Sequence, residues 1–419
     1  MSTTEYRWSH AERVWPGDPG APGGRANRRG FRYRAYVPGP VARWRPVLPA
    51  DLADDAVRAE VACRDLGRHG ARLETLLWPL LRSEALASSR IEGLVLSHHR
   101  LAHAGLTATA DPTAAGVRAN VAAVRAAVEL AAGGAPITPA TLDLLHGALL
   151  GEAAPAIAGR VRTAQNWIGG RHPNPRGAAF VPPPPEEVPR LMGDLCRFIA
   201  RDDLPAVVQA AIAHVQFETI HPYADGNGRL GRILIPVVLR RRGVTAPPGG
   251  GLGAVPPVSL VLAADGDGYV RALQAFRAGD TEPWLRLCAW AVWRAAQAAE
   301  ELAARVEALT GQWRVTAGGP RPHSAAARLI AALPAEPVVD LAAVQRLTGS
   351  SHEAARLAIA RLADAGVLRQ VGGGRRGRIW EAVGLFALLD DLEAGLGPGR
   401  AGRAPVRPPT GPPAPRTAG

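Results

Sequence analysis

Residues 221–232 bring acid–base, metal-binding and anion-binding side chains into one short segment. The segment reads HPYADGNGRLGR and contains one histidine, one aspartate, one asparagine, three glycines and two arginines. The following residues have a helical pattern, whereas glycine is poorly suited to a helix interior, so Gly226, Asn227 and Gly228 are expected in a turn that opens a helix. Unpaired backbone N–H groups and the positive end of the helix dipole favour phosphate at such a turn.

The charged side chains of this segment extend the prediction to a polyphosphate. Arg229 and Arg232 are three residues apart, so they lie on one helix face and can reach the same anion. Asp225 would repel phosphate unless a divalent cation lay between them, and Mg²⁺ is commonly bound by one carboxylate together with phosphate oxygens. His221 can accept a proton near neutral pH. The set predicts phosphoryl or nucleotidyl transfer; the alternative is a glycine-rich turn with surface arginines and a structural histidine.

Helices are expected to position this segment from both sides. Two amphipathic helices are predicted over residues 186–201 and 203–219, leading directly into it. Helical periodicity also dominates residues 52–106, and two further helices are expected within residues 113–151, the second of them with Thr138 as its N-terminal cap. The chain is thus expected to be mostly α.

Two segments predict strands. VRTAQNWIGG and GAAFVPPPP, on either side of a loop, predict a short β-hairpin before the residue 186–201 helix. Beyond Arg321, three helices are followed by a strand, a basic turn and a strand, which is the pattern of a winged helix. We therefore divide the chain into a flexible lead-in (1–30), an N-terminal helical region (31–110), a helical core (111–310), a winged-helix domain (321–390) and a disordered basic Pro/Gly-rich tail (396–419).

Composition excludes several classes of site. The 419 residues include 49 basic ones, all of them arginine, so a Walker A lysine and a Schiff-base lysine are excluded. The net charge of +12 comes partly from the tail and argues only weakly for nucleic acid. Cys63, Cys196 and Cys288 lie far apart, which suggests buried thiols and neither a disulfide framework nor a zinc site. No apolar run is long enough to span a membrane, and we expect a cytoplasmic protein.

Residues 221–232 resemble the signature of Fic-domain proteins, H-[PX]-[FY]-x-[DE]-G-N-G-R-x-x-R, at every defined position. The similarity continues in RTAQNWIGG and AFVPPPPEEVPRLMGDLCRFI, which resemble the family's flap hairpin and its following helix, and in SEALASSRIEGL upstream. The resemblance implies a Fic-type helical core with a short hairpin flap. It also implies transfer of AMP from ATP to a hydroxyl of a target protein, with release of pyrophosphate.

The resemblance assigns roles by position. His221 would deprotonate a Ser, Thr or Tyr hydroxyl of the target, and Asp225 would bind Mg²⁺ against the phosphates. The backbone of Gly226–Gly228 would form the anion cradle, and Arg229 and Arg232 would bind the polyphosphate.

Three neighbouring positions refine this assignment. Pro222 and Tyr223 are expected to fix the loop, with Tyr223 packed inward. Gly228 argues against relatives that have a lysine there and phosphorylate instead. Tyr269 resembles an aromatic residue that lies against adenine, although a tyrosine on a helix face can equally belong to the core.

Ser88, Glu92 and Gly93 resemble the family's inhibitory motif, [ST]-x-x-x-E-[GN]. Ser88 and Glu92 are four residues apart and share a helix face, and Gly93 suits a helix end. The resemblance implies that Glu92 pairs with Arg232 and displaces the γ-phosphate of ATP from its productive position. The alternative is a helix-terminal glutamate that pairs with any nearby arginine.

The flap hairpin and the winged helix each suggest more than one kind of partner. Exposed edges of the flap hairpin suit docking of an extended target segment, or the hairpin has a structural role alone. The winged helix, with Arg375, Arg376 and Arg378 in its wing, suggests a DNA-binding regulator as the alternative function. Its last helix carries two acids, so contact with protein is equally supported. The target and the oligomeric state, a homodimer included, are left open.

Overall fold

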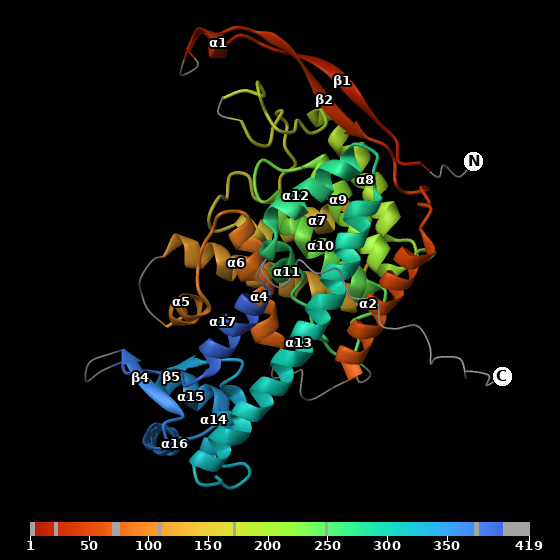
Figure 1. Ribbon diagram of the computed structural model, residues 1–419. Coiled ribbons are helices and arrows are strands. Elements are labelled where there is room, and N and C mark those ends of the chain that lie inside the picture. Colours follow the sequence, from red (N-terminus) through yellow and green to blue (C-terminus); the bar gives the residue numbers. More distant parts are fainter. Residues whose placement is uncertain are drawn as a thin grey trace, which may run out of the picture.

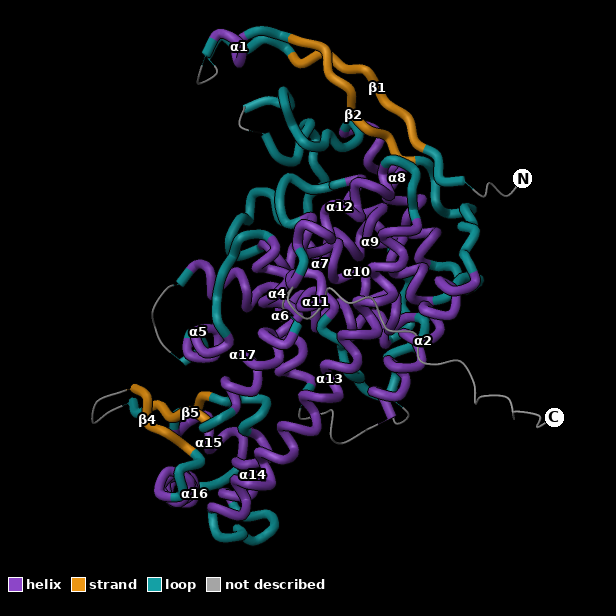
Figure 2. The backbone as a smooth tube through the Cα atoms, viewed as in Figure 1, coloured by secondary structure: helices purple, strands orange, loops and turns teal. Residues whose placement is uncertain are grey.

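The structure is a computed structural model that describes residues 5–20, 24–68, 76–106, 111–170, 173–247, 250–372 and 377–396. Helices form the body of the molecule, and the two small sheets lie at opposite ends of it (Figure 2). This confirms the predicted mostly α fold. No helix among these residues is both long enough and apolar enough to cross a membrane. The helices of the body are α2 (Ala50–Arg68), α4 (Leu77–Ile91), α5 (His98–His103), α6 (Pro112–Ala132), α7 (Pro139–Leu150), α8 (Val188–Ile199), α9 (Ala206–Ile220), α10 (Asn227–Arg241), α11 (Val258–Ala264), α12 (Gly266–Arg277) and α13 (Glu282–Thr316).

Helix α9 is the centre of the body. Every one of its residues is buried, because α2, α8, α10 and α13 all pack against it. The expected amphipathic pattern for this helix is therefore wrong, since a helix covered on all sides needs no polar face. The cap predicted for α7 is present: Thr138 accepts a hydrogen bond from the backbone N–H of Thr141.

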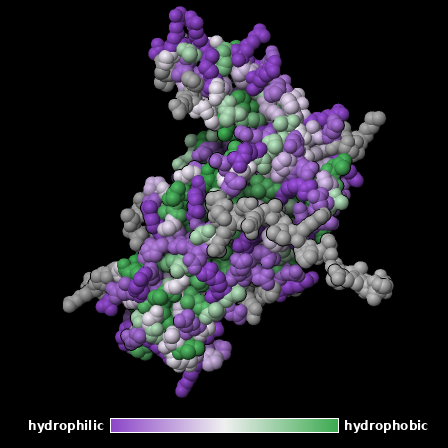
Figure 3. Space-filling view, viewed as in Figure 1, coloured by the Kyte–Doolittle hydropathy of each residue, from purple (hydrophilic) through white to green (hydrophobic). Residues whose placement is uncertain are grey.

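The N-terminal residues form a β-hairpin. Strand β1 (Trp8–Trp15) pairs antiparallel with β2 (Phe31–Pro38), from Trp8 opposite Pro38 to Trp15 opposite Phe31. The expectation of a flexible lead-in over residues 1–30 is thus wrong for β1, because aromatic cross-strand contacts such as Trp8 on Tyr36 stabilise the pairing. The far end of the hairpin carries the short helix α1 (Arg25–Arg28) and is mostly hydrophilic (Figure 3).

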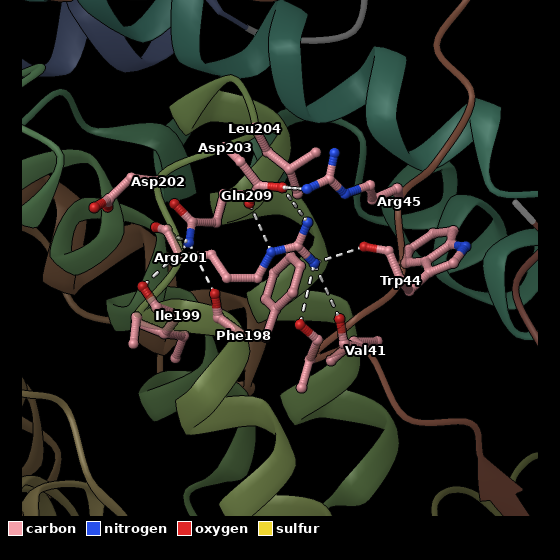
Figure 4. Close-up of polar contacts among 12 residues, drawn as sticks. Val41, Trp44, Arg45, Phe198, Ile199, Arg201, Asp202, Asp203, Leu204 and Gln209 are labelled. Carbon is pink, nitrogen blue, oxygen red and sulfur yellow. Dashed lines mark hydrogen bonds and ion pairs between the residues drawn. The ribbon is translucent and has the colours of Figure 1, made fainter. Parts of the chain in front are cut away.

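Arg201 fastens the segment that follows this hairpin to the body (Figure 4). Its guanidinium donates to the carbonyl oxygens of Val41 and Trp44, with the Trp44 contact at 2.6 Å, and pairs with Asp203. The side-chain amide of Gln209 on α9 donates to the carbonyl oxygen of Arg201 at 2.9 Å. The start of α9 is therefore fixed to both α8 and the N-terminal segment.

The flap has less strand structure than the sequence predicts. Between residues 161 and 183, the described residues contain two isolated bridges, Val161 with Tyr223 and Ile168 with Phe180, and no longer strand. The predicted short hairpin is confined to the Ile168–Phe180 pairing, in which the backbone N–H of each residue donates to the carbonyl oxygen of the other, because the glycines after Ile168 and the prolines after Val181 end the two runs.

The C-terminal unit follows the long helix α13, which runs from the body into it (Figure 1). Three helices and then two paired strands appear in the predicted order, and a third short strand extends the antiparallel sheet to the order β3-β5-β4. The turn with Arg375 and Arg376 and the tail beyond Leu396 lie outside the described residues. The unit contains α14 (Ala325–Ala332), β3 (Val338–Val339), α15 (Leu341–Thr348), α16 (His352–Asp364), β4 (Leu368–Gly372), β5 (Ile379–Ala382) and α17 (Leu385–Gly395).

Candidate active site

The segment singled out in the sequence is the turn between α9 and α10. His221 ends α9 in the left-handed region, with φ of 50°, and Gly226 precedes α10 with φ of 75°. A histidine with positive φ is uncommon and is tolerated only where the surroundings fix the backbone. Asn227 and Gly228 form the first turn of α10, as the sequence predicts.

Asn227 and His146 fix this turn from within. The Asn227 side chain accepts from the backbone N–H of Tyr223 at 2.9 Å and donates to its carbonyl oxygen at 2.8 Å. The Nδ1 atom of His146 accepts from the N–H of Gly159, so Nε2 carries the proton and donates to the carbonyl oxygen of Asp225 at 2.9 Å. The His146 ring stacks on Tyr223, which is fully buried. Tyr223 therefore packs inward, as predicted.

The flap contributes two further anchors. Arg162, 6% exposed, donates to the carbonyl oxygens of His221 at 2.8 Å and Pro183 at 2.6 Å. Asn166 donates to the carbonyl oxygen of Tyr223 at 3.0 Å. These contacts join both sides of the flap to the turn, so displacement of the flap would disturb the backbone of His221.

The His221 imidazole is set up as a neutral base. Its Nδ1 lies 3.4 Å from the carbonyl oxygen of Glu218, and since a carbonyl can only accept, Nδ1 carries the proton and Nε2 keeps its lone pair. Burial first and the nearby Arg277 second lower the pKa of His221 to about 3. At neutral pH the ring is therefore uncharged and able to accept a proton.

The side chain of Glu92, at the end of α4, packs against the first turn of α10. The guanidinium of Arg232, 1% exposed, donates from Nη2 to Glu92 at 2.7 Å and from Nε to the Ser88 hydroxyl at 2.9 Å. A β-carbon at Gly228 would collide with the Glu92 carboxylate. Gly93 follows the end of α4 with φ of 82°. The contact expected between Glu92 and Arg232 is thus present, and a carboxylate occupies the predicted anion cradle.

Arg229 and Asp225 leave donors and acceptors available beside this carboxylate. Arg229 is 6% exposed, and its buried Nε has no hydrogen-bond partner within the described part of the chain. The Asp225 carboxylate is 68% exposed and lies 3.9 Å from the Arg229 guanidinium. An orphaned guanidinium donor suits an anion, and an exposed carboxylate suits a hydrated divalent cation.

Tyr269 occupies the core position left open as the alternative. It is 3% exposed, its hydroxyl lies 2.8 Å from Nε2 of His214, and its ring packs near Trp284. Its ring is therefore covered by protein, which leaves it no open face for adenine.

Two charged residues beside His221, the buried Glu218 and the partly buried Arg277, were missed from the sequence. Glu218 carries a carboxyl whose pKa is raised to about 7, chiefly by burial. Arg277 on α12 donates to the carbonyl oxygen of Glu218 at 3.2 Å and lies over the ring of Phe180 in the flap. The position of Glu218, three residues before His221, was a signal within the sequence. Arg277 gave none, because only the tertiary fold brings it to this turn.

Comparison with known proteins places this site in context. A model of the Fic/DOC family matches residues 136–239, which include the flap, α9 and most of α10. Protein adenylyltransferase fic-1 of Caenorhabditis elegans is 30% identical over 148 residues, covering 35% of this chain and 25% of that protein. Probable protein adenylyltransferase aq_aa38 of Aquifex aeolicus is 44% identical over 69 residues, covering 16% of this chain and 22% of that protein.

A solved structure supports the fold over a longer stretch. A Fic family protein from Desulfovibrio desulfuricans G20 superimposes with a TM-score of 0.50 at 20% identity, covering 81% of this chain and 97% of that one. The curated relatives, by contrast, are matched over only about a quarter of their length. The solved structure thus shows the fold, and the family match is confined to residues 136–239.

Proposed function

Because residues 136–239 form a domain of the Fic/DOC family, we propose that this chain transfers AMP from ATP to a side-chain hydroxyl of a target protein. One observation carries the proposal: the Glu92 carboxylate lies against Gly228 and Arg232, where an anion of the chain itself occupies the place offered to phosphate. The names of the relatives, protein adenylyltransferases, agree with it.

The cradle would bind and orient the triphosphate. Backbone N–H groups at the start of α10 face the phosphates together with the helix dipole, and Arg229 supplies its unpartnered Nε. Asp225 fits a Mg²⁺ ion because its carboxylate is exposed beside the cradle. The ion would neutralise part of the phosphate charge.

His221 would act on the incoming hydroxyl. Nε2 accepts the hydroxyl proton, the oxygen forms a bond to the α-phosphorus, and the bond to the bridging oxygen breaks so that pyrophosphate leaves. The pKa of about 3 makes the free imidazole a weak base. Bound polyphosphate adds negative charge near the ring, which raises that pKa toward neutrality.

Glu92 would restrain this activity. While its carboxylate pairs with Arg232 at 2.7 Å, the guanidinium cannot bind the γ-phosphate, and the triphosphate is displaced from the in-line geometry. The Arg232 side chain is 2% exposed and that of Glu92 is 38% exposed. The glutamate can therefore leave toward solvent while the arginine stays in place.

The target would reach the site over the flap. Arg162 and Asn166 of the flap donate to the carbonyl oxygen of His221, and the backbone of the nearby Ile168–Phe180 bridge offers groups with which an extended segment could pair. In the C-terminal unit, Glu353 and Arg356 of α16 pair with each other. No feature of the described residues favours contact with DNA over contact with protein.

The test uses ATP labelled on either the α- or the γ-phosphate. Full-length protein with Glu92→Gly is incubated with a cell lysate and Mg²⁺, and protein-bound label is measured beside the wild type. Label from α-labelled ATP alone is the expected result. Label from γ-labelled ATP would indicate a kinase instead, and no label from either would contradict nucleotidyl transfer.

A further inference from the structure

A second cluster of side chains lies where α5 meets the C-terminal sheet. Ser97 caps α5 by accepting from the backbone N–H of Arg100, and the helix presents His99 and His103 on one face because they are four residues apart. Both imidazoles point to Glu381 of β5. Nε2 of His99 is 2.9 Å and Nε2 of His103 is 3.5 Å from the same carboxylate oxygen, Oε2.

These separations match the edges of a metal coordination sphere. Zn²⁺ bonds to imidazole nitrogen and carboxylate oxygen at about 2.0–2.2 Å, so two ligand atoms of a tetrahedral site lie about 3.3 Å apart. The two measured distances lie on either side of that value, and the ligand atoms of all three residues are within 4.8 Å of one another. Small side-chain rotations would complete the three-ligand arrangement.

The surroundings of Glu381 also suit a ligand. Its side chain is 4% exposed, and Arg369 of the neighbouring strand donates to Oε1 from Nε at 3.1 Å and from Nη2. The second oxygen is thereby turned toward the two histidines. Metal-binding carboxylates are commonly oriented by such outer hydrogen bonds. The His99 side chain is 50% exposed, which leaves solvent access for a water as the fourth ligand.

We propose that His99, His103 and Glu381 form a binding site for a divalent transition metal of the Zn²⁺ class. Two imidazoles at helical spacing and one carboxylate are a common ligand set for zinc. The metal would cross-link α5 to β5, two elements that are 282 residues apart at His99 and Glu381. The competing interpretation is a hydrogen-bonded cluster in which a histidine N–H donates to Glu381 and no metal binds.

The first measurement is equilibrium binding of Zn²⁺ to the chelator-treated full-length protein, in competition with a chromophoric chelator. One equivalent is expected, and His99→Gln is expected to weaken it by at least about tenfold, since removal even of outer-shell partners costs 10- to 100-fold. His99 is half-exposed, so this substitution leaves the fold intact. His352→Gln removes an exposed histidine of α16 and serves as the matched control with unchanged affinity.

The second measurement is spectroscopic and needs no variant. Co²⁺ bound to the wild type in place of Zn²⁺ should give the visible bands of a four-coordinate site with nitrogen and oxygen ligands. It should give no thiolate charge-transfer band, because Cys63, Cys196 and Cys288 are all buried. Zn²⁺ at about 100 times the wild-type Kd should also raise the Tm of the wild type by more than that of His99→Gln, for which the same concentration is about 10 times Kd or less.

Three outcomes would overturn the proposal. Absence of saturable Zn²⁺ binding by the wild type would favour the hydrogen-bonded cluster. Equal affinity in wild type, His99→Gln and His103→Gln would place the metal elsewhere on the chain. A thiolate band in the Co²⁺ spectrum would assign the metal to a cysteine. None of these outcomes depends on the transfer activity.

Discussion

Helix α4 carries one carboxylate within its length and one at its end, and the two are held in different ways. Glu84 is 2% exposed and accepts hydrogen bonds from the backbone N–H and the hydroxyl of Ser259 at 2.7 and 2.5 Å. Glu92 is the C-cap residue of α4, and its side chain, which pairs with Arg232, is 38% exposed. Burial raises the pKa of Glu84 to about 7.

We call Glu84 the anchor, because it holds α4 in place, and Glu92, in its proposed inhibitory role, the latch. Glu84 joins α4 to α11 in a site that solvent cannot reach, so the body of the helix stays in place. Glu92 meets its arginine at the edge of solvent, where the phosphate of a ligand or a water can replace it. In the proposed function, release of the cradle would then require movement of one residue at the helix end and would leave the rest of α4 packed.

The largest effect is expected from removal of the His221 imidazole in protein that already lacks the Glu92 carboxylate. In protein that already carries Glu92→Gly, His221→Ala should lower labelling by about 10²- to 10⁴-fold, the usual contribution of a general base. ATP should still bind, because the imidazole acts on the hydroxyl. Labelling from α-labelled ATP and calorimetric ATP binding measure the two quantities. Activity close to that of the parent would show that the released site works without His221.

Removal of the latch alone should give the next largest effect. Glu92→Gly frees Arg232 for the γ-phosphate and should raise labelling by about 10- to 100-fold, because hydrogen bonds to charged groups contribute about 1.5–3 kcal/mol. Glu92→Gln keeps the size of the side chain and removes its charge, so an intermediate gain is expected. The measurement is the initial rate of labelling from α-labelled ATP.

Arg232→Ala is the control for this gain. The double variant should be as inactive as Arg232→Ala alone, since the freed arginine is the means by which release acts, and this non-additivity is what a double-mutant cycle measures. A rate in Glu92→Gly at or below the wild-type value would refute the latch.

The sequence was most informative where a short motif carries the geometry. Arg232 meets Glu92 across 140 residues, and that contact was expected from resemblance to the Fic signature and its inhibitory motif. The turn at Gly226 and the cap at Thr138 were also expected, because glycine and capping residues act locally. Local rules and family motifs together therefore predict the turn and the latch.

Features that depend on distant partners were not predicted. Strand β1 was assigned to a flexible lead-in because the Gly/Pro-rich residues before α1 dominated the composition, while its partner β2 lay beyond them. Arg277 reaches Glu218 only through the packing of α12. The four-residue spacing of His99 and His103 is visible in the sequence, but only the tertiary fold brings Glu381 of β5 to them, so the cluster could not be predicted.

The anchor makes a prediction about pH. The folded-state pKa of Glu84, about 7, exceeds the unfolded value of about 4.3, so folding takes up a proton between them. Its contribution to the free energy of unfolding is fully present below about pH 4.3 and is lost as pH rises to about 7. Glu84→Gln mimics the protonated form and should reduce the decline in stability between pH 5 and pH 7.5 by about 2–2.5 kcal/mol.

Urea unfolding followed by circular dichroism at the two pH values measures this difference. Part of the decline should persist in the variant, because the pKa of Glu218 is raised to about 7 by burial as well. Glu300→Gln, at an exposed position of α13, should leave the wild-type decline unchanged. An equal decline in wild type and Glu84→Gln would mean that Glu84 does not titrate in this range.

The smallest effect is expected from contacts of the C-terminal unit that help to hold Glu92 in place. Arg90, two residues before Glu92, pairs with Glu393 of α17 at 2.6 Å, and His98 contacts the same carboxylate. The side chains of Arg90 and Glu393 are 36% and 16% exposed. A partly exposed ion pair contributes about 1 kcal/mol or less, so Arg90→Ala should raise basal labelling by about fivefold or less. Arg305→Ala is the matched control, because it removes a pair of the same length between α13 and α17 that lies outside α4.

In protein with Glu92→Gly the gain from Arg90→Ala should vanish, since the Glu92 carboxylate is no longer present to be held in place. Equal labelling rates in Arg90→Ala, Arg305→Ala and wild type would show that α4 keeps Glu92 in place without help from α17.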